Sequence, residues 1–351
     1  MKKVFIKTFG CQSNIADSEV IAGILSDDFE IVDDIKKTNI VIVNTCGVKS
    51  KTQNKIVRYI QDIPKTKKVF VGGCLPRMLD LKKLLPNVPG FFDVNSITKV
   101  KELIKGKKEI FSDKKEDLIL KSVIRKDRIG RINISRGCLG NCSYCSVKFA
   151  RGNLRSYGEE DIIKSIKISL KEGCELIYLS SQDNSCYGKD IGTNLVNLLK
   201  KIVQINEKFK VRVGMMNPQH ILPFLDELVE VYKNDKIIKF IHIPIESGSD
   251  KILEDMNRGY KIKDLRRIVK KFRKIPKINV ATDIITGFPT ETEKDFNQTL
   301  NLIKEIKPEI LNISKFGSRP KTKAAKMKQL KSQIIKERSK RLSEEFKKLK
   351  K

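Results

Sequence analysis

The sequence lacks any apolar run of the length that a membrane-spanning helix needs, about 20 residues. At the amino terminus the apolar run Val4–Ile6 is ended by Lys7 and by the polar segment Cys11–Asn14, too early for a secretory signal peptide. We therefore predict a cytoplasmic protein that does not enter a membrane. In that reducing compartment the eight cysteines are better explained as metal ligands than as disulfides.

Acidic residues are also scarce relative to basic ones. The chain has 42 aspartate and glutamate residues against 72 lysine and arginine residues, which gives a formal net charge of +30. Such an excess of one sign is self-repelling and favours a polyanionic partner, of which nucleic acid is the first candidate. A lysine-rich composition without a specific partner is the alternative that the charge alone leaves open.

Histidine is nearly absent, since His220 and His242 are the only two. Three cysteines with the spacing C-x3-C-x2-C follow a β-like run, at Cys138, Cys142 and Cys145. Thiolates select iron–sulfur clusters or zinc, and a structural zinc site would need a fourth cysteine or histidine nearby. Three ligands leave one iron of a [4Fe-4S] cube open for a substrate or cofactor. With Tyr144 before the last cysteine, the spacing resembles the radical S-adenosylmethionine (SAM) signature; a zinc knuckle is the alternative.

Three more cysteines follow predicted strands in the first part of the chain. These strands are short, β-branched runs typical of parallel sheets, at Val4–Thr8, Asn39–Asn44 and Lys68–Val71. Helical patterns between and after them indicate a doubly wound α/β domain, at 17–26, 48–62 and 76–85. The cysteines after the strands are Cys11, Cys46 and Cys74. Because ligands bind beyond the carboxyl ends of parallel strands, we expect the three thiols to converge there. Taken singly, each could be an ordinary buried cysteine.

Six further strand-like runs alternate with helical patterns and predict a partial (β/α)6 barrel. The runs lie at 131–135, 176–180, 211–215, 240–243, 279–285 and 310–314. Barrel chemistry is found at the carboxyl ends of the strands, and the loop that begins at Cys138 follows the first run. Polar or glycine-containing segments follow the other runs, which predicts a ligand pocket at this rim. Cys174 and Cys186 are interpreted as packing residues.

The chain is therefore predicted to have four parts: a flavodoxin-like domain at 1–110, a linker at 111–127, the barrel at 128–316 and a basic helix at 317–351. From Lys315 to Lys351 there are 15 basic and 3 acidic residues, and apolar residues recur near helical spacing. We predict that this terminal helix contacts RNA. A solvated tail is the alternative.

With both cysteine sets placed, the chain resembles the tRNA methylthiotransferases over nearly its whole length. The matching stretches are Thr8–Asn14, Asn44–Cys46, Gly72–Cys74 and the Cys138–Cys145 loop. It is most similar to the branch that acts on N6-threonylcarbamoyladenosine, through the segments Phe149–Leu154, Tyr187–Thr193 and Thr282–Pro289. The family implies a flavodoxin-like domain with one cluster, a radical SAM barrel with another, and a terminal RNA-binding β-barrel. For that β-barrel we expect no room in this sequence, which is a departure from the family.

The resemblance also implies a set of cofactor-binding residues. Two [4Fe-4S] clusters are expected, one on Cys11, Cys46 and Cys74 and one on Cys138, Cys142 and Cys145. SAM contacts are expected from Tyr144, Gln182, Asp183, Glu246, Ser247, Arg258 and Gly287. Arg258 is the candidate partner of the SAM carboxylate, since a guanidinium suits bidentate recognition; a surface arginine is the alternative. The family more often has glutamine where Glu246 stands.

The implied reaction is methylthiolation of N6-threonylcarbamoyladenosine at position 37 of tRNA. A 5′-deoxyadenosyl radical from SAM removes the hydrogen at C2 of the adenine, the first cluster holds the sulfur, and a second SAM supplies the methyl group. The anticodon loop is single-stranded, so its base can enter a pocket without breaking a duplex. Besides tRNA, the expected partners are an electron donor and a sulfur source, and the protein is expected to be a monomer. Alternatives are isopentenyl-adenosine in tRNA, an aspartate of a ribosomal protein, or a non-enzymatic electron carrier or RNA-binding sensor.

Overall fold

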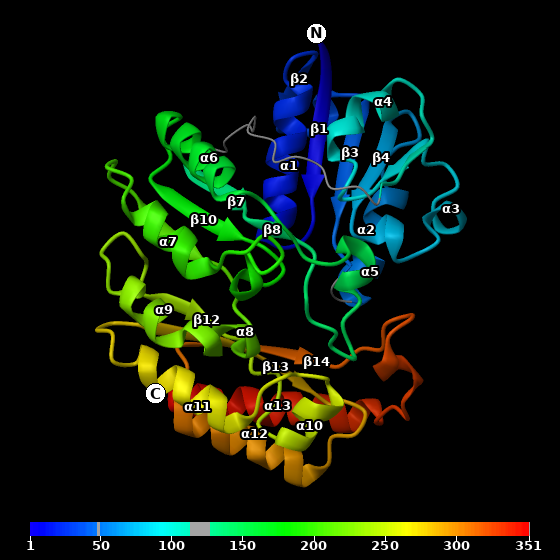
Figure 1. The fold of residues 1–351 in the computed structure, drawn as a ribbon. Coiled ribbons are helices and arrows are strands. Elements are labelled where there is room, and N and C mark those ends of the chain that lie inside the picture. Colours follow the sequence, from blue (N-terminus) through cyan, green and yellow to red (C-terminus); the bar gives the residue numbers. More distant parts are fainter. Residues whose placement is uncertain (48–49, 113–126, 351) are drawn as a thin grey trace. The chain divides into compact units, whose positions relative to one another are not determined.

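The computed structural model describes residues 1–47, 50–112 and 127–350 (Figure 1). The chain divides into two compact units that are discontinuous in sequence. The first comprises Met1–Cys138 and Ser146–Gln182, and the second comprises Leu139–Cys145 and Asp183–Lys351. The first unit thus takes in the beginning of the segment predicted as a barrel. Most of the predicted linker, residues 113–126, lies outside the described residues.

A six-stranded parallel sheet organises the first unit (Figure 1). Its strands, in spatial order, are β2 (Phe29–Val32), β1 (Lys2–Thr8), β3 (Ile40–Thr45), β4 (Lys68–Gly73), β5 (Gly90–Phe92) and β6 (Glu109–Ile110). Successive side chains point to opposite faces of a strand. Val41 and Val43 accordingly pack with Ile56 of α2 (Ser50–Gln61), whereas Ile42 packs with Leu25 of α1 (Gln12–Leu25). Both faces of β3 are therefore covered, as its apolar run predicts.

Some elements of this sheet domain differ from the prediction. The strands β2, β5 and β6, which were not predicted, have only four, three and two residues and are too short to form a pattern in the sequence. The single helix predicted at 76–85 is wrong, because the segment is divided into the 3₁₀ turn η2 (Leu75–Arg77) and the short helix α3 (Leu81–Leu84). Asp80 caps α3 by accepting a hydrogen bond from the Lys83 N–H, which starts a new helix instead of continuing the first turn.

The rest of the first unit comprises two strand pairs, three helices and two 3₁₀ turns. The strand β7 (Ile129–Asn133) pairs in parallel with β10 (Leu176–Ser180) through α6 (Glu159–Lys171), as predicted for the first β–α–β step. The antiparallel pair β8 (Ser135–Arg136) and β9 (Arg155–Ser156) lies on either side of α5 (Val147–Arg151) in sequence. The remaining elements are α4 (Val100–Ile104) and the 3₁₀ turns η1 (Ile35–Lys37) and η3 (Ile97–Lys99).

The second unit continues the alternation of strands and helices. Its parallel sheet has the order β12 (Phe240–His242), β13 (Asn279–Thr286), β14 (Ile310–Lys315), and β11 (Lys210–Val213) precedes these strands in the chain. The intervening helices are α7 (Leu195–Val203), α8 (Pro218–Ile221), α9 (Leu225–Tyr232), α10 (Asp250–Asp255), α11 (Ile262–Phe272) and α12 (Glu293–Ile306). Three short 3₁₀ turns complete it: η4 (Asn184–Cys186), η5 (Leu222–Phe224) and η6 (Lys323–Lys326). Among the described residues, no helix is long and apolar enough to cross a membrane.

The basic terminal segment is an integral part of this second unit. Its helix α13 begins only at Ser332 and ends at Leu349, and it packs against α12 and β14 (Figure 1). Leu342 is fully buried, and Ile335 occupies the space that a side chain on Gly287 would need. Arg338 is 5% exposed, and its Nη1 donates to the backbone oxygen and to Oε2 of Glu291 at 2.9 and 2.8 Å. The helix therefore has a packed face and a basic solvent face.

Replacing Arg338 with methionine should destabilise the second unit by about 3–5 kcal/mol, because it leaves the buried Glu291 without its cation. Burial already raises the pKa of Glu291, while the Gly287 N–H and Arg338 favour its charged form. The matched control is Lys340→Met on the exposed face of the same helix, where an exposed ion pair contributes little. Urea denaturation measures both. Equal stability of the two variants would mean that the buried pair does not hold α13 in place.

Candidate functional site

The first three predicted ligands follow adjacent strands at one edge of the six-stranded sheet. The register pairs Thr45 of β3 with Gly73 of β4, so the next residues, Cys46 and Cys74, are neighbours. The Cys74 N–H donates to the Thr45 oxygen at 2.9 Å. Cys11 follows β1, which pairs with β3 on its other side. The order β1-β3-β4 is thus the physical reason that cysteines distant in sequence reach one edge.

A glycine brings the Cys11 segment close to Cys46. Gly10 has a φ of +130°, and a Cβ built on it would lie 2.8 Å from the Cβ of Cys46. Any larger residue would be strained in that conformation and would push the two loops apart. The short approach keeps the strand ends together, with Cys46 and Cys74 buried and Cys11 exposed.

Two residues that the sequence patterns did not single out organise this edge, Asn14 and Arg151. The Asn14 Oδ1 accepts hydrogen bonds from the Cys11 Sγ at 3.5 Å and from the Arg151 Nη2 at 2.9 Å. The Asn14 Nδ2 donates to the Thr45 oxygen at 2.7 Å, directly before Cys46. Both residues lie within stretches that resemble the family, but nothing in their spacing assigns them a role. Only the fold brings residue 151 to the strand ends of the first domain.

The electrostatics of this edge suit anionic sulfur. Burial raises the pKa of the Cys74 thiol, whereas the neighbouring Arg151 guanidinium lowers it. Burial alone would lower the pKa of Arg151, but Cys74, Asp17 and Cys11 raise it, so this arginine stays charged. A set of three sulfur donors beside a buried cation fits a thiolate-bound centre, since thiolates next to a cation are the form that binds metal.

The second cysteine set lies on a loop whose start is shaped by glycine. Gly137 has a φ of +73°, and a Cβ on it would come within 1.9 Å of the Asn153 backbone oxygen. The following Cys138 donates its N–H to the Gly152 oxygen at 3.3 Å. These contacts lie within the first unit and set the backbone direction at Cys138.

Cys142 and Cys145 belong to the second unit. Between them, Ser143 is fixed by hydrogen bonds to other segments of that unit. The Ser143 N–H donates to the Met256 oxygen at 2.9 Å, and the Ser143 Oγ donates to the Asp255 oxygen at 2.8 Å. The Ser143 oxygen in turn accepts from the Ala324 N–H at 2.9 Å. These hydrogen bonds, two made by the backbone and one by the Ser143 hydroxyl, orient the loop between Cys142 and Cys145.

Tyr144 links this loop to the end of β12. Its hydroxyl donates to the Glu246 Oε1 at 2.9 Å, and its ring packs near Ile252, Met256 and Phe288. Burial, followed by the charge of Glu246, raises the pKa of Tyr144 well above its ordinary value. Glu246 has a φ of +67°, a conformation that costs a non-glycine residue roughly 1–3 kcal/mol. Such backbone strain at Glu246 indicates that the orientation of its buried carboxyl group is important for the site.

Arg258 lies against the cysteine loop. Its Nη1 donates to the Cys142 Sγ at 3.3 Å, its Nη2 donates to the Pro244 oxygen at 3.2 Å, and its guanidinium lies 5.3 Å from the Tyr260 ring centroid. Burial would lower the pKa of Arg258, but Tyr260, Tyr144 and Cys142 raise it. The guanidinium is therefore a partly buried cation beside the Cys142 sulfur, not a surface arginine.

The other predicted SAM contacts differ in their surroundings. Gln182 lies in the first unit, with its Nε2 3.5 Å from the Ser13 Oγ. The Ser247 Oγ is 3.4 Å from the Thr299 Oγ1 on α12. The Gly287 N–H donates to the Glu291 Oε2 at 2.8 Å, under α13. Ser247 and Gly287 are thus engaged by the helices that cover the sheet, whereas Tyr144, Glu246 and Arg258 gather at the cysteine loop.

Asp183 belongs to a polar cluster that the sequence patterns did not indicate. The Lys189 Nζ lies 3.1 Å from the His220 Nδ1, and since an ammonium group only donates, the ring proton is assigned to Nε2. Burial lowers the pKa of His220, as does Lys189, which favours this neutral ring. The His220 Nε2 and the Asp183 Oδ2 are buried, 4.0 Å apart and without hydrogen-bond partners among the described residues. They offer one donor and one acceptor side by side.

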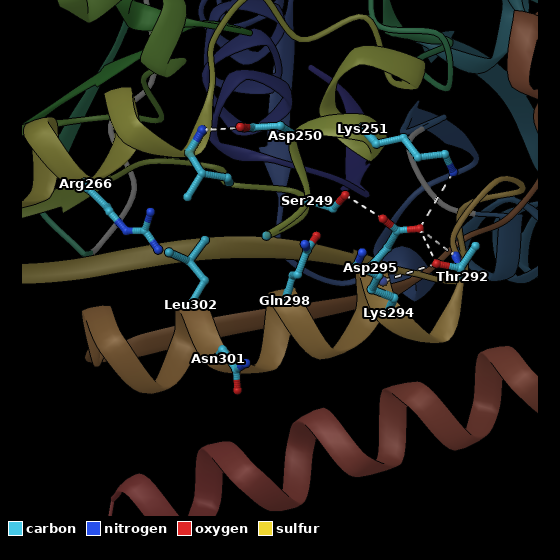
Figure 2. A pocket seen from close by; sticks show the side chains of 12 residues that line it. Ser249, Asp250, Lys251, Arg266, Thr292, Lys294, Asp295, Gln298, Asn301 and Leu302 are labelled. Atoms are coloured by element: carbon cyan, nitrogen blue, oxygen red, sulfur yellow. Dashed lines mark hydrogen bonds and ion pairs between the residues drawn. The ribbon is translucent and has the colours of Figure 1, made fainter.

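A groove of about 610 Å³ lies elsewhere on the second unit (Figure 2). The start of α10 and the helices α11 and α12 line it, and none of the predicted site residues takes part. On one side of the groove the Asp295 carboxylate accepts from the Ser249 and Thr292 hydroxyls and pairs with Lys251.

Within the described ranges, no three His, Cys, Asp or Glu residues are grouped to hold a single metal ion. A [4Fe-4S] cluster takes one thiolate on each iron, so its cysteine sulfurs do not need to meet at one point.

Comparison with protein families matches residues 132–303 to the Radical SAM superfamily and residues 3–91 to the Uncharacterized protein family UPF0004. The chain is 42% identical to the probable threonylcarbamoyladenosine tRNA methylthiotransferase of Pyrococcus abyssi, over 97% of this chain and 83% of that protein. The chain belongs to the threonylcarbamoyladenosine tRNA methylthiotransferase family. Identity to the human threonylcarbamoyladenosine tRNA methylthiotransferase is 36%, over 99% of this chain and 62% of the human protein.

Solved structures support the fold of this methylthiotransferase-family chain. The radical SAM methyltransferase TsrM from Kitasatospora setae, bound to tryptophan and a SAM analogue, is similar with a TM-score of 0.69 at 15% identity. The similarity covers 93% of this chain and 75% of TsrM. The α/β fold with an amino-terminal parallel sheet and a radical SAM domain, predicted from the sequence, is confirmed. Membership of the radical SAM superfamily implies SAM and a [4Fe-4S] cluster.

Proposed function

We propose that the chain is a tRNA methylthiotransferase that converts N6-threonylcarbamoyladenosine at position 37 to its 2-methylthio derivative. The observation that carries the proposal is the presence of two separate three-cysteine sets on a chain of this family. One set suits SAM cleavage, and a second with an open iron suits the handling of sulfur. An electron carrier would instead complete four ligands on each cluster.

At the radical SAM loop, the proposed ligands are Cys138, Cys142 and Cys145. The cluster that they would hold supplies the electron for the cleavage of SAM. Tyr144 and Glu246 hold the loop against the end of β12, and Arg258 contributes a positive charge beside Cys142. Such pre-arranged contacts position the cofactor without reorganisation during the reaction.

At the sheet edge, the proposed ligands of the second [4Fe-4S] cluster are Cys11, Cys46 and Cys74. The residues present fit such a group: three soft donors at adjacent strand ends, with Asn14 joining the Cys11 thiol to the Arg151 guanidinium. This cluster would supply the sulfur that is transferred. The protein then also needs a sulfur source and an electron donor, and we infer that it works in the cytoplasm as a monomer.

For the nucleoside, His220 and Asp183 are the proposed polar contacts at the second unit. A donor beside an acceptor is complementary to the N7 edge of the modified adenine, where N7 accepts and the one N–H left on the carbamoylated N6 donates. Lys189 adds a cation, which suits the carboxylate of a threonyl group. We further infer domain limits of 1–110, 128–316 and 317–351, with 111–127 as the linker.

The test is nucleoside mass spectrometry of tRNA after incubation with the reconstituted enzyme, SAM, sulfide and a strong reductant. Transcripts that carry N6-threonylcarbamoyladenosine at position 37 should yield the 2-methylthio nucleoside. Matched transcripts with unmodified adenosine or with isopentenyl-adenosine should yield at most background. Equal methylthiolation of the isopentenyl substrate would replace the proposed substrate by the alternative one.

A further inference from the structure

Arg151 is one of the most deeply buried charged residues of the first unit. It is the last residue of α5, six positions after Cys145, and is 1% exposed. A buried guanidinium must be compensated, because removing a charge from water costs several kcal/mol. Arginine is almost never fully buried unless it is paired. The partners of this side chain therefore indicate what it is for.

The carboxylate that faces Arg151 is shared. Asp17 accepts from the Arg151 Nη2 at 3.0 Å, but it also accepts from the Arg136 Nη2 at 3.2 Å and from the Asn133 Nδ2 at 3.0 Å. Asp17 therefore neutralises Arg151 only in part. The Arg151 Nη1 is buried and makes no hydrogen bond to any described residue. Besides Asp17 and Asn14, the polar neighbours of the guanidinium are the thiols of Cys74 and Cys11.

The other neighbours of Arg151 are cysteines. The Asn14 side chain accepts hydrogen bonds from both the Cys11 thiol and Arg151. Asn14 therefore bridges the guanidinium and the Cys11 thiol. Ala150, the preceding residue of α5, packs with Cys74, Met78 and Val94. The part of α5 that ends at Arg151 is therefore seated on the cysteine edge of the sheet.

We propose that Arg151 is the buried counter-ion of the iron–sulfur centre that Cys11, Cys46 and Cys74 hold, and that its charge strengthens the binding of an anionic sulfur ligand, hydrosulfide or a thiolate, to that centre. The inference rests on the proposed function. Three thiolates make such a centre anionic, and each added electron or sulfur anion makes it more so. A cation fixed in a low-dielectric site favours these more negative states. Arg151 acts through the centre and is a positioning residue.

The test uses the full-length chain with Cys138, Cys142 and Cys145 all changed to alanine, so that one centre remains. In this background Arg151→Gln removes the charge, and Arg151→Lys keeps it. The matched control is Arg155→Gln, an arginine of the same unit whose Nη2 donates to the Asn95 Oδ1. Three quantities are measured for each variant. They are the iron content per chain, the midpoint potential from an EPR-monitored redox titration, and the affinities for hydrosulfide and methanethiolate from changes in the EPR spectrum.

Arg151→Gln should lower the midpoint potential and weaken the binding of both anions about tenfold or more, as expected when a charge a few ångströms away is removed. Arg151→Lys should recover most of both properties, and Arg155→Gln should match the parent. If the Arg151→Lys variant binds iron and the Arg151→Gln variant does not, that result would also support the role of Arg151 as a counter-ion. A loaded glutamine variant with the parent potential and affinities would overturn the inference, and so would equal losses in the lysine and glutamine variants. A parent protein that binds no iron would overturn the proposed function as well.

Discussion

Replacing Cys138 with alanine should abolish the reductive cleavage of SAM completely, whereas replacing Cys46 should leave cleavage in place and abolish methylthiolation of tRNA. The reason is the separation of the two sets: Cys46 follows β3 of the amino-terminal sheet, and Cys138 begins the radical SAM loop. Loss of one ligand in a set of three removes the support of that cluster only. The amounts of 5′-deoxyadenosine and of the 2-methylthio nucleoside are measured in parallel by mass spectrometry.

Iron content provides the internal check on this experiment. The intact protein should bind about eight irons after anaerobic reconstitution, two clusters of four, and loss of one set should leave about half. The matched control is Cys174→Ala. Cys174 is buried in the first unit and belongs to neither cysteine set, so its replacement should leave the iron content unchanged. Methylthiolation by the Cys46 variant would exclude the sheet-edge cluster as the sulfur site.

Neutralising exposed lysines of the terminal segment should weaken tRNA binding about tenfold or more at low salt and flatten its dependence on salt. Lysines that bind phosphates release condensed counterions, and each lysine–phosphate interaction that is removed should reduce the log–log slope by roughly 0.7–0.9. The variant replaces Lys326, Lys328, Lys331, Lys336 and Lys347 with glutamine, all exposed and clear of the packed face of α13. Deletion of the segment would be a poor test, because it would also remove the buried Arg338 and Leu342.

The matched control removes the same number of charges from the first unit. It replaces the exposed residues Lys55, Lys65, Lys83, Lys99 and Lys105 with glutamine. Filter binding or fluorescence anisotropy from about 50 to 200 mM salt gives the affinity and the slope for each protein. Both variants should retain the iron content of the parent. Equal losses in the two variants would mean that the terminal segment has no special part in RNA binding and contributes only to the overall charge.

Local sequence patterns were sufficient to predict those features that depend on residues close together in the sequence. The β-branched runs at Asn39–Asn44 and Lys68–Val71 predict buried parallel strands, and a residue just past such a strand lies at the carboxyl edge whatever packs around it. The spacing of the cysteine loop likewise indicates an iron–sulfur loop before any coordinates are known. Long periodic helices such as Glu159–Lys171 and Glu293–Ile306 lie where helical patterns were predicted between the strand-like runs.

By itself, then, the sequence determined the strand-and-helix order, the two cysteine sets and the excess of positive charge. Only the tertiary structure decided which side chains compensate one another. Arg151 reaches Asn14 and Asp17 across more than 130 residues of chain, and Arg338 reaches Glu291 across 47. The physical reason is that a buried charge takes whichever partner the fold brings within hydrogen-bond distance, and no local spacing encodes that choice. The same applies to the terminal helix, whose packed face depends on Gly287 and Glu291, residues that precede it by a whole strand and helix.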